Sequence, residues 1–178
     1  MIKLNAKIIK AFQGSTKPDI KVMGANRIRV AKDKADLVKS LVVSENPTSP
    51  FQTYADVLVF AAALGAKWKK RSPLGIISTK EPGPIALDVF VSRGYDRVLK
   101  LLAIAETKEA NILSPIDEIA EEKRIHIFEE YANGGLEILR DELRGAVDYS
   151  DRIVLMLNDE RVRATQPQGE FDLSRFLT

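Results

Sequence analysis

The 178-residue sequence contains no cysteine, which excludes disulfide bonds, thiolate metal sites and cysteine nucleophiles. A single histidine leaves no pair of imidazoles for a zinc site, and no glycine-rich phosphate-binding loop follows a predicted strand. No apolar run approaches the roughly 20 residues that span a bilayer, and the first residues lack the pattern of a signal peptide. We therefore expect a cytoplasmic protein without membrane association, cofactor, metal site or catalytic residues.

Charge is divided unevenly along the chain, although the formal net charge is only +2. Residues 1–80 carry 15 Lys and Arg against 5 Asp and Glu, a net of +10, whereas residues 81–178 carry 12 against 20, a net of −8. A basic half suits a polyanion such as nucleic acid, and an acidic half suits a basic protein partner. The alternative is that the two halves attract each other within one fold.

The sequence predicts one mainly α-helical domain with a minor β element over residues 26–163. A basic arm (1–25) precedes this domain, and a tail (164–178) with apolar residues on a polar strip follows it. The tail residues are expected to dock on a surface, most simply one of the same molecule.

The spacing of apolar residues along the chain predicts where the strand and the helices lie. Arg27 to Val30 alternates charged and apolar residues, as a half-buried strand does. A first amphipathic helix begins near Asp33, and a second begins at a capping box of Thr53 and Asp56 and ends at Gly65. Further helices are predicted at 95–106, at 114–132 with Ser114 as N-cap and a stop at Asn133-Gly134-Gly135, at 136–143 and at 150–162.

Residues 66–84 have no helical period, and a structureless loop of this length is uncommon in a compact domain. A β-hairpin is one solution, with strands at Gly75–Thr79 and Ile85–Val91 around Pro82-Gly83-Pro84.

The densest basic cluster, Lys67-Trp68-Lys69-Lys70-Arg71, follows the second helix directly. Several cations with an aromatic side chain form the chemistry that contacts phosphates and stacks on bases. The alternative is ordinary surface, because lysines at a helix C-terminus meet the helix dipole favourably and a lone Trp often anchors a core.

Arg27 and Arg29 on one face of a strand that two helices follow have the order of a ribbon-helix-helix unit, which reads the major groove with strands paired between two protomers. The alternative is a pair of charges that keeps an edge strand soluble.

His126 is flanked at helical spacing by Glu122 on one side and by Glu129 or Glu130 on the other. These side chains are the candidates for metal or acid–base chemistry, although solvated side-chain pairs on an exposed helix are the simpler interpretation.

Five blocks of the chain resemble the family called dnd system-associated protein 4. They are Arg27–Arg29, Phe51–Gly65, Arg71–Leu74, Leu101–Ala105 and Ile127–Leu136, and the resemblance covers roughly Asn26 to Arg163. It implies a role beside the machinery that replaces a DNA backbone oxygen with sulfur, or beside the restriction proteins that read that mark in antiviral defence. It supplies no catalytic residues, and the first 25 and last 15 residues are expected to lie outside the family pattern.

Together these observations predict a non-catalytic DNA-binding or regulatory accessory of a phosphorothioation-based system, with a homo-oligomer expected only if the ribbon-helix-helix interpretation of Arg27 and Arg29 holds. Its DNA contacts are predicted at Lys67, Trp68, Lys69, Lys70, Arg71, Arg27 and Arg29. The alternative is an adaptor that binds proteins of the modification or restriction complex through its acidic helices (117–130 and 137–142) and its tail.

Overall fold

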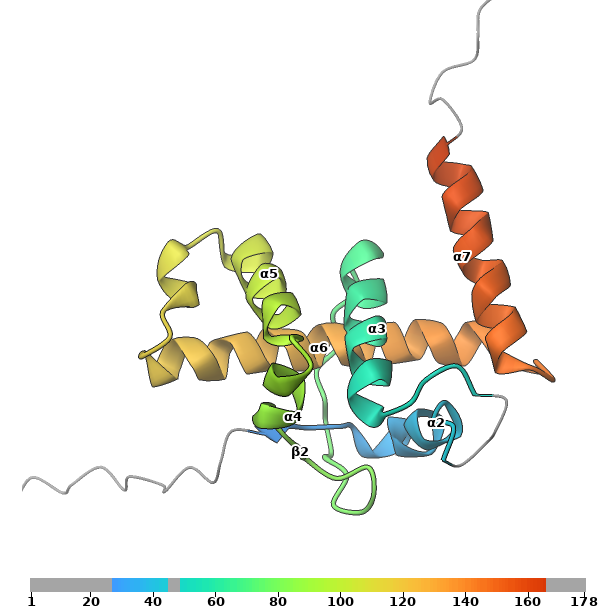
Figure 1. Ribbon diagram of the computed structural model, residues 1–178, viewed down its shortest axis with the longest axis horizontal. Helices are drawn as coiled ribbons and strands as arrows, with labels where there is room; N and C mark the ends of the chain where they lie inside the picture. The colour runs from blue at the N-terminus through green and yellow to red at the C-terminus, as the bar shows by residue number, and fades with distance from the viewer. Residues whose placement is uncertain (1–26, 45–48, 166–178) are drawn as a thin grey trace, which may run out of the picture.

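A computed structural model describes residues 27–44 and 49–165, so the predicted N-terminal arm and the tail beyond Thr165 lie outside the described residues. The described part is mainly α-helical with a minor β element, as predicted. In chain order its elements are β1 (Arg27–Ile28), the 3-10 helix η1 (Lys32–Lys34), α2 (Ala35–Ser40), α3 (Tyr54–Lys67), β2 (Ile85–Ala86), α4 (Leu87–Ser92), α5 (Asp96–Thr107), the 3-10 helix η2 (Ala110–Leu113), α6 (Glu118–Glu142) and α7 (Tyr149–Thr165). Figure 1 shows α3 and α5 lying across the long α6, with α7 leaving the C-terminal end of α6.

Helix α3 begins at the predicted capping box. The Asp56 backbone N–H donates to Thr53 Oγ1 at 3.3 Å, and the Thr53 N–H donates to Asp56 Oδ2 at 2.9 Å. The predicted stop at Gly65 is wrong, because the helix continues to Lys67. A Cβ on Gly65 would lie 2.2 Å from the Tyr131 carbonyl oxygen, so this glycine permits a close approach to α6.

Helix α6 is continuous over 25 residues, and the predicted break at Asn133-Gly134-Gly135 is wrong. A Cβ on Gly135 would lie 1.8 Å from the Ala61 carbonyl oxygen, and one on Gly134 would lie 2.2 Å from that of Lys70. Gly135 therefore lets the backbones of α6 and α3 approach each other, and Gly134 lets the segment that follows α3 lie against α6. The helix starts at Asp117, which accepts the N–H groups of residues 119 and 120, and not at the predicted Ser114.

The predicted hairpin between residues 75–79 and 85–91 is wrong. Strand β2 pairs antiparallel with β1, and Ile77 forms an isolated antiparallel bridge with Ala31, so both segments pair with the chain near β1. Residues 87–92 form α4 because Leu87 and Phe90 follow a helical period, and Phe90 is fully buried. Strand β1 thus has one antiparallel neighbour, β2, within its own chain.

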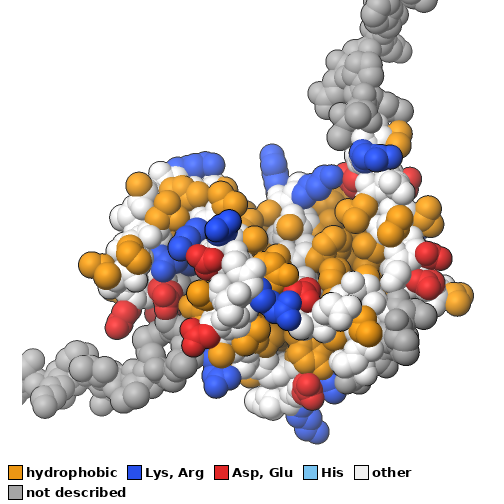
Figure 2. All heavy atoms as spheres, viewed as in Figure 1, with side chains coloured by type: hydrophobic (Ala, Val, Ile, Leu, Met, Phe, Trp, Pro, Cys, Tyr) orange, Lys and Arg blue, Asp and Glu red, His pale blue; other side chains and the backbone are white. Residues whose placement is uncertain are grey.

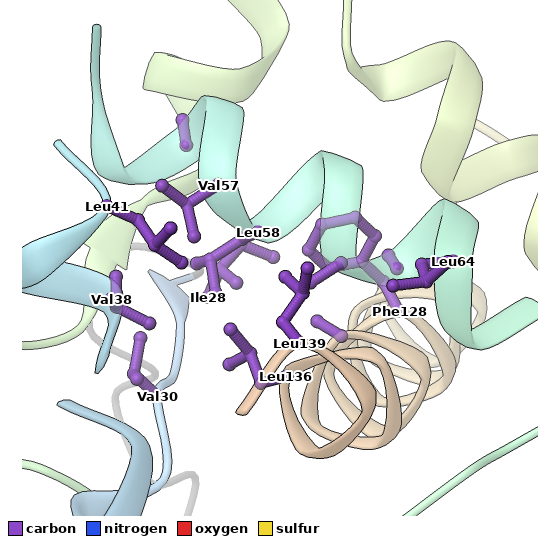
Figure 3. Packing of buried hydrophobic residues seen from close by; sticks show 14 of the residues in the cluster. Ile28, Val30, Val38, Leu41, Val57, Leu58, Leu64, Phe128, Leu136 and Leu139 are labelled. Atoms are coloured by element: carbon purple, nitrogen blue, oxygen red, sulfur yellow. The ribbon is translucent and has the colours of Figure 1, made fainter. Parts of the chain in front are cut away.

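The core lies where α2 and β1 meet α3 and α6. Figure 3 shows labelled core members pointing toward one another from these elements and from the residues next to β1 and α2: Ile28, Val30, Val38, Leu41, Val57, Leu58, Leu64, Phe128, Leu136 and Leu139. Phe90 adds α4 through an edge-to-face contact with Phe128, with ring centroids 5.7 Å apart. Within the described ranges, no helix is both long enough and apolar enough to cross a bilayer.

Candidate functional site

The predicted basic cluster lies at the C-terminal end of α3, as the sequence indicated. Lys67 is the last helical residue, and the chain reverses through Lys69, whose φ is 52°. The Lys70 N–H then donates to the Gly65 carbonyl at 2.8 Å. The turn brings Lys70 and Arg71 beside α6, whereas Lys67 lies next to Glu160 of α7.

Carboxylates from the acidic half of the chain engage most of this cluster. Lys67 Nζ lies 2.7 Å from Glu160 Oε2, and Lys70 Nζ lies 3.0 Å from Glu137 Oε2. Arg71 pairs with both Glu106 and Glu130 and lies over the Tyr131 ring. The attraction between the two halves of the chain therefore operates inside the fold.

The same network lowers the pKa of Glu106. The hydrogen bond that the Tyr131 hydroxyl donates, at 2.6 Å, has the largest effect, and the charge of Arg71 adds to it. A carboxylate held charged in this way is a strong partner for the guanidinium. Phosphates would have to displace it to reach Arg71.

Trp68 and Lys69 face solvent, as does about half of the ion-paired Lys67 side chain. The Trp68 side chain is 47% exposed, and Lys69 has no ion-pair partner among the described residues. Together with Lys67 and Glu160, these two residues line a shallow hollow of about 270 Å³. The free part of the predicted site is therefore small.

The Arg29 side chain binds a buried carboxylate of the same chain and does not project freely from an edge strand. Its guanidinium binds Glu129 through two nitrogens, with distances of 2.6 to 3.1 Å, and its backbone N–H donates to Glu129 Oε1 at 2.7 Å. Glu129 is 1% exposed. Arg27 remains exposed and donates to the Pro84 carbonyl at 2.9 Å, so the structure does not join both arginines into one free face.

A cleft on another part of the surface is lined by two lysines and two carboxylates, and two further cations outside its lining, Lys70 and Arg140, pair with those carboxylates. It has a volume of about 600 Å³, and its lining comes from Lys32–Lys34 of η1, from Pro73–Ile76, and from Asn133 and Glu137 of α6. We call it the Lys34 cleft.

Two carboxylates in the Lys34 cleft are shared among several cations. Lys34, only 3% exposed, pairs with Asp33 and lies 4.0 Å from Glu137. Arg140 lies 3.9 Å from Asp33, and Glu137 also binds Lys70. The exposed Lys32 adds a cation with no ion-pair partner in the part of the chain that the structure describes.

The four cations Lys32, Lys34, Lys70 and Arg140 and the two carboxylates Asp33 and Glu137 together carry a net charge of +2 at neutral pH. The hydrogen bond from Lys34 lowers the pKa of Asp33, and Arg140 adds to this effect, so Asp33 stays ionised. The basic half of the sequence thus has a local excess of positive charge here, beside apolar residues of the 73–76 segment.

Asn133 fixes the wall of the Lys34 cleft. Its amide nitrogen donates to the carbonyls of Ser72, at 3.3 Å, and Pro73, at 2.8 Å. The Lys32 N–H holds the other end of this segment by donating to the Ile76 carbonyl at 2.7 Å. The Asn133 carbonyl oxygen Oδ1 is buried without a hydrogen-bond partner, which costs roughly 1 to 3 kcal/mol in lost hydration.

Sequence reasoning missed Lys32, Lys34, Asn133 and Arg140. The sequence contains one indication that Lys34 is unusual, because this lysine falls on the apolar face that Leu37, Val38 and Leu41 define at helical spacing. A lysine on an apolar face is unusual and marks a position with a special partner. The contacts of Asn133 and Arg140 come from residues about 60 to 107 positions away, so no local pattern reveals them.

The other candidate trio lies on the outer face of α6. His126 Nε2 is 3.2 Å from Glu130 Oε1, and the histidine is more than half exposed. Glu130 is also the partner of Arg71, and Glu122 is exposed on the same helix. Among the described residues, no group of three or more acidic, histidine or cysteine side chains gathers as a metal site.

Comparison with known proteins places the chain in a family. No curated protein and no solved structure matches it. One family model matches residues 27–176 and carries the description DNA sulphur modification system-associated protein 4. The match reaches beyond Arg163, so the expectation that the last 15 residues lie outside the family pattern is wrong. The chain belongs to the family of DNA sulphur modification system-associated protein 4.

Proposed function

We propose that this protein is a non-catalytic accessory that contacts DNA phosphates through the Lys34 cleft and its rim. The observation that carries the proposal is the local excess of cations: Lys34, Lys70 and Arg140 share Asp33 and Glu137, and the exposed Lys32 adds a cation without an ion pair among the described residues. Family membership supplies the context of a DNA modification system.

The charge balance favours this cleft over the end of α3. Phosphate contacts gain free energy by releasing counterions from DNA, and a cation already paired with a carboxylate contributes less to that release. Arg29 and Lys67 each have one carboxylate partner, and Arg71 has two. The Lys34 cleft is where cations outnumber their partners.

The test is the salt dependence of DNA binding. Each phosphate contact contributes about 0.9 to the slope of log K against log salt on duplex DNA. Replacing Lys32 and Arg140 together with alanine should lower the slope by roughly 1.8, because both side chains are solvent-accessible. Fluorescence anisotropy of a labelled duplex at several salt concentrations measures this change.

Arg97→Ala is the matched control, because this exposed arginine lies on α5, which contributes no residue to the cleft. Its slope should equal that of the parent protein. An unchanged slope in the double variant, or a larger loss in Lys69→Ala, would remove the Lys34 cleft from the DNA contact.

A protein adaptor is the second candidate, and the exposure of α7 favours it. Only Ile153 and Met156 of its described side chains are buried, whereas Val154, Leu155, Leu157 and Val162 are each about half exposed. Figure 2 shows hydrophobic side chains gathered over α3 and α7 on one face. The acidic helices support this role less directly, because several of their carboxylates already bind internal cations.

Co-purification with the proteins of the DNA sulphur modification system tests this adaptor role. Val154→Ser combined with Leu157→Ser should abolish retention, because polar groups would replace apolar contact area. Leu101→Ser, on the equally exposed surface of α5, is the control and should retain the partner. Loss of the partner in the control alone would contradict an α7 interface.

A further inference from the structure

The Lys34 cleft presents two kinds of polar contact close together. The Lys34 ammonium is almost completely buried beside Asp33 and Glu137, and a network with excess positive charge attracts an anion. Asn133 lines the same cleft, and its buried Oδ1 is an acceptor without a donor. A ligand that satisfies both must carry negative charge and an N–H or O–H group.

The third contact surface is apolar. Leu74 and Ile76 line the cleft, and the Ile76 side chain is 76% exposed although both ends of its segment are fixed by hydrogen bonds. The volume of about 600 Å³ is typical of small-molecule sites and exceeds the needs of one phosphate ion. The remaining space suits a sugar and the flat face of a base.

We infer that the Lys34 cleft binds one phosphorylated nucleoside unit. The phosphate lies toward Lys32 and Lys34, the base or sugar packs on the segment of Leu74 and Ile76, and an amino or hydroxyl group donates to Asn133 Oδ1. The unit comes either from a free nucleotide or from an unpaired nucleotide of DNA. The inference uses the same site as the proposed DNA contact and rests on it for the DNA source only.

Titration with three small probes tests the chemistry of the site. The backbone amide signals of Lys32, Gly75 and Ile76 are followed by NMR while dAMP, inorganic phosphate or deoxyadenosine is added. We expect dAMP to bind at least about tenfold more tightly than either part alone, because it makes both the ionic and the apolar contacts. Equal affinity for phosphate and dAMP, or for deoxyadenosine and dAMP, would overturn the inference.

A charge at the mouth of the cleft tests the location without disturbing the core. Ile76→Glu should weaken dAMP binding about fivefold relative to the isosteric Ile76→Gln, because the new carboxylate repels the phosphate. Ile119→Glu, at another highly exposed isoleucine outside the cleft, is the control and should bind dAMP as the parent does. Equal affinities of the two Ile76 variants would overturn the location.

Competition with DNA separates the two sources. A blunt duplex and the same duplex with one unpaired 5′ adenosine compete against dAMP in the parent protein. Displacement by the second duplex alone supports an unpaired DNA nucleotide as the source. Binding of dAMP without binding of either duplex supports the inference with a free nucleotide and refutes the DNA contact. Binding of both duplexes without binding of dAMP overturns the inference and leaves the DNA contact standing.

Discussion

Adding a single methyl group at Gly135 should destabilise the protein, although alanine is the better helix former. Its Cβ would lie 1.8 Å from the carbonyl oxygen of Ala61, 2.5 Å from the carbonyl carbon and 3.0 Å from the Cα atom. Ordinary contact begins near 3.4 Å, so α3 and α6 must separate locally by roughly 1.6 Å. All three atoms belong to helix backbone, so no side-chain rotation relieves the contact.

The magnitude follows from two opposing effects. Alanine gains about 1 kcal/mol over glycine in a helix interior. Overpacking in a close-packed interior costs typically 1 to 3 kcal/mol, and a backbone-to-backbone contact belongs at the upper end, about 3 kcal/mol. Gly135→Ala should therefore lower the free energy of unfolding by about 2 kcal/mol. For a domain of this size, Tm should fall by about 6 °C.

Thermal and urea unfolding followed by circular dichroism measure this loss. Gly83→Ala is the matched control, because the nearest atom to its Cβ, the Lys80 carbonyl oxygen, is 3.7 Å away. Its stability should stay within about 0.5 kcal/mol of the parent. A Gly135→Ala protein as stable as the parent would refute the close contact between α3 and α6.

Three further changes test other parts of the fold. Arg29→Ala should cost about 3 to 5 kcal/mol in urea unfolding, because it leaves the buried Glu129 carboxylate unpaired; a cost below 1 kcal/mol would assign Arg29 to the surface. Thr53→Ala should cost about 1 kcal/mol by removing the N-cap of α3, with α3 otherwise intact by circular dichroism. Burial raises the pKa of Asp56, but hydrogen bonds from Tyr95 and Thr53 lower it by more, so the pKa lies below its ordinary value. Its contribution to stability is complete above an unfolded pKa of about 3.9 and is lost as pH falls through the lower folded pKa, so Asp56→Asn should flatten the acid limb of the stability curve.

Local signals predicted the parts of the fold that local contacts determine. The capping box of Thr53 and Asp56 was readable because donor and acceptor lie three residues apart. The strand at Arg27 and the helical period of α5 were equally visible. The fold class follows from such elements, and the structure confirms it.

The misread elements depend on contacts far apart in sequence. The sequence does not distinguish a glycine that ends a helix from one that lets two helices pack closely, and it therefore predicts stops at Gly65 and Gly135 where the structure has close helix contacts. The predicted hairpin is wrong for a similar reason, because residues 85 and 77 pair with Ile28 and Ala31, which are far away in the sequence.

The candidate site was only partly predictable. The cluster at Lys67–Arg71 was found because its charges are consecutive, but the carboxylates that neutralise it come from α5, α6 and α7. The Lys34 cleft combines η1, the 73–76 segment and α6. Net charge along the chain indicated that positive potential exists, and only the tertiary arrangement decides where it remains.

The carboxylates along α6 bind cations of their own chain at positions where an external polyanion would otherwise bind. Glu129, Glu130 and Glu137 occupy cations that a passing polyanion would otherwise recruit. Because a carboxylate of the same chain is present at high effective concentration, an external polyanion would have to displace it to reach these cations. If the protein contacts DNA as proposed, these ion pairs would confine the contact to the few cations of the described residues that no carboxylate occupies.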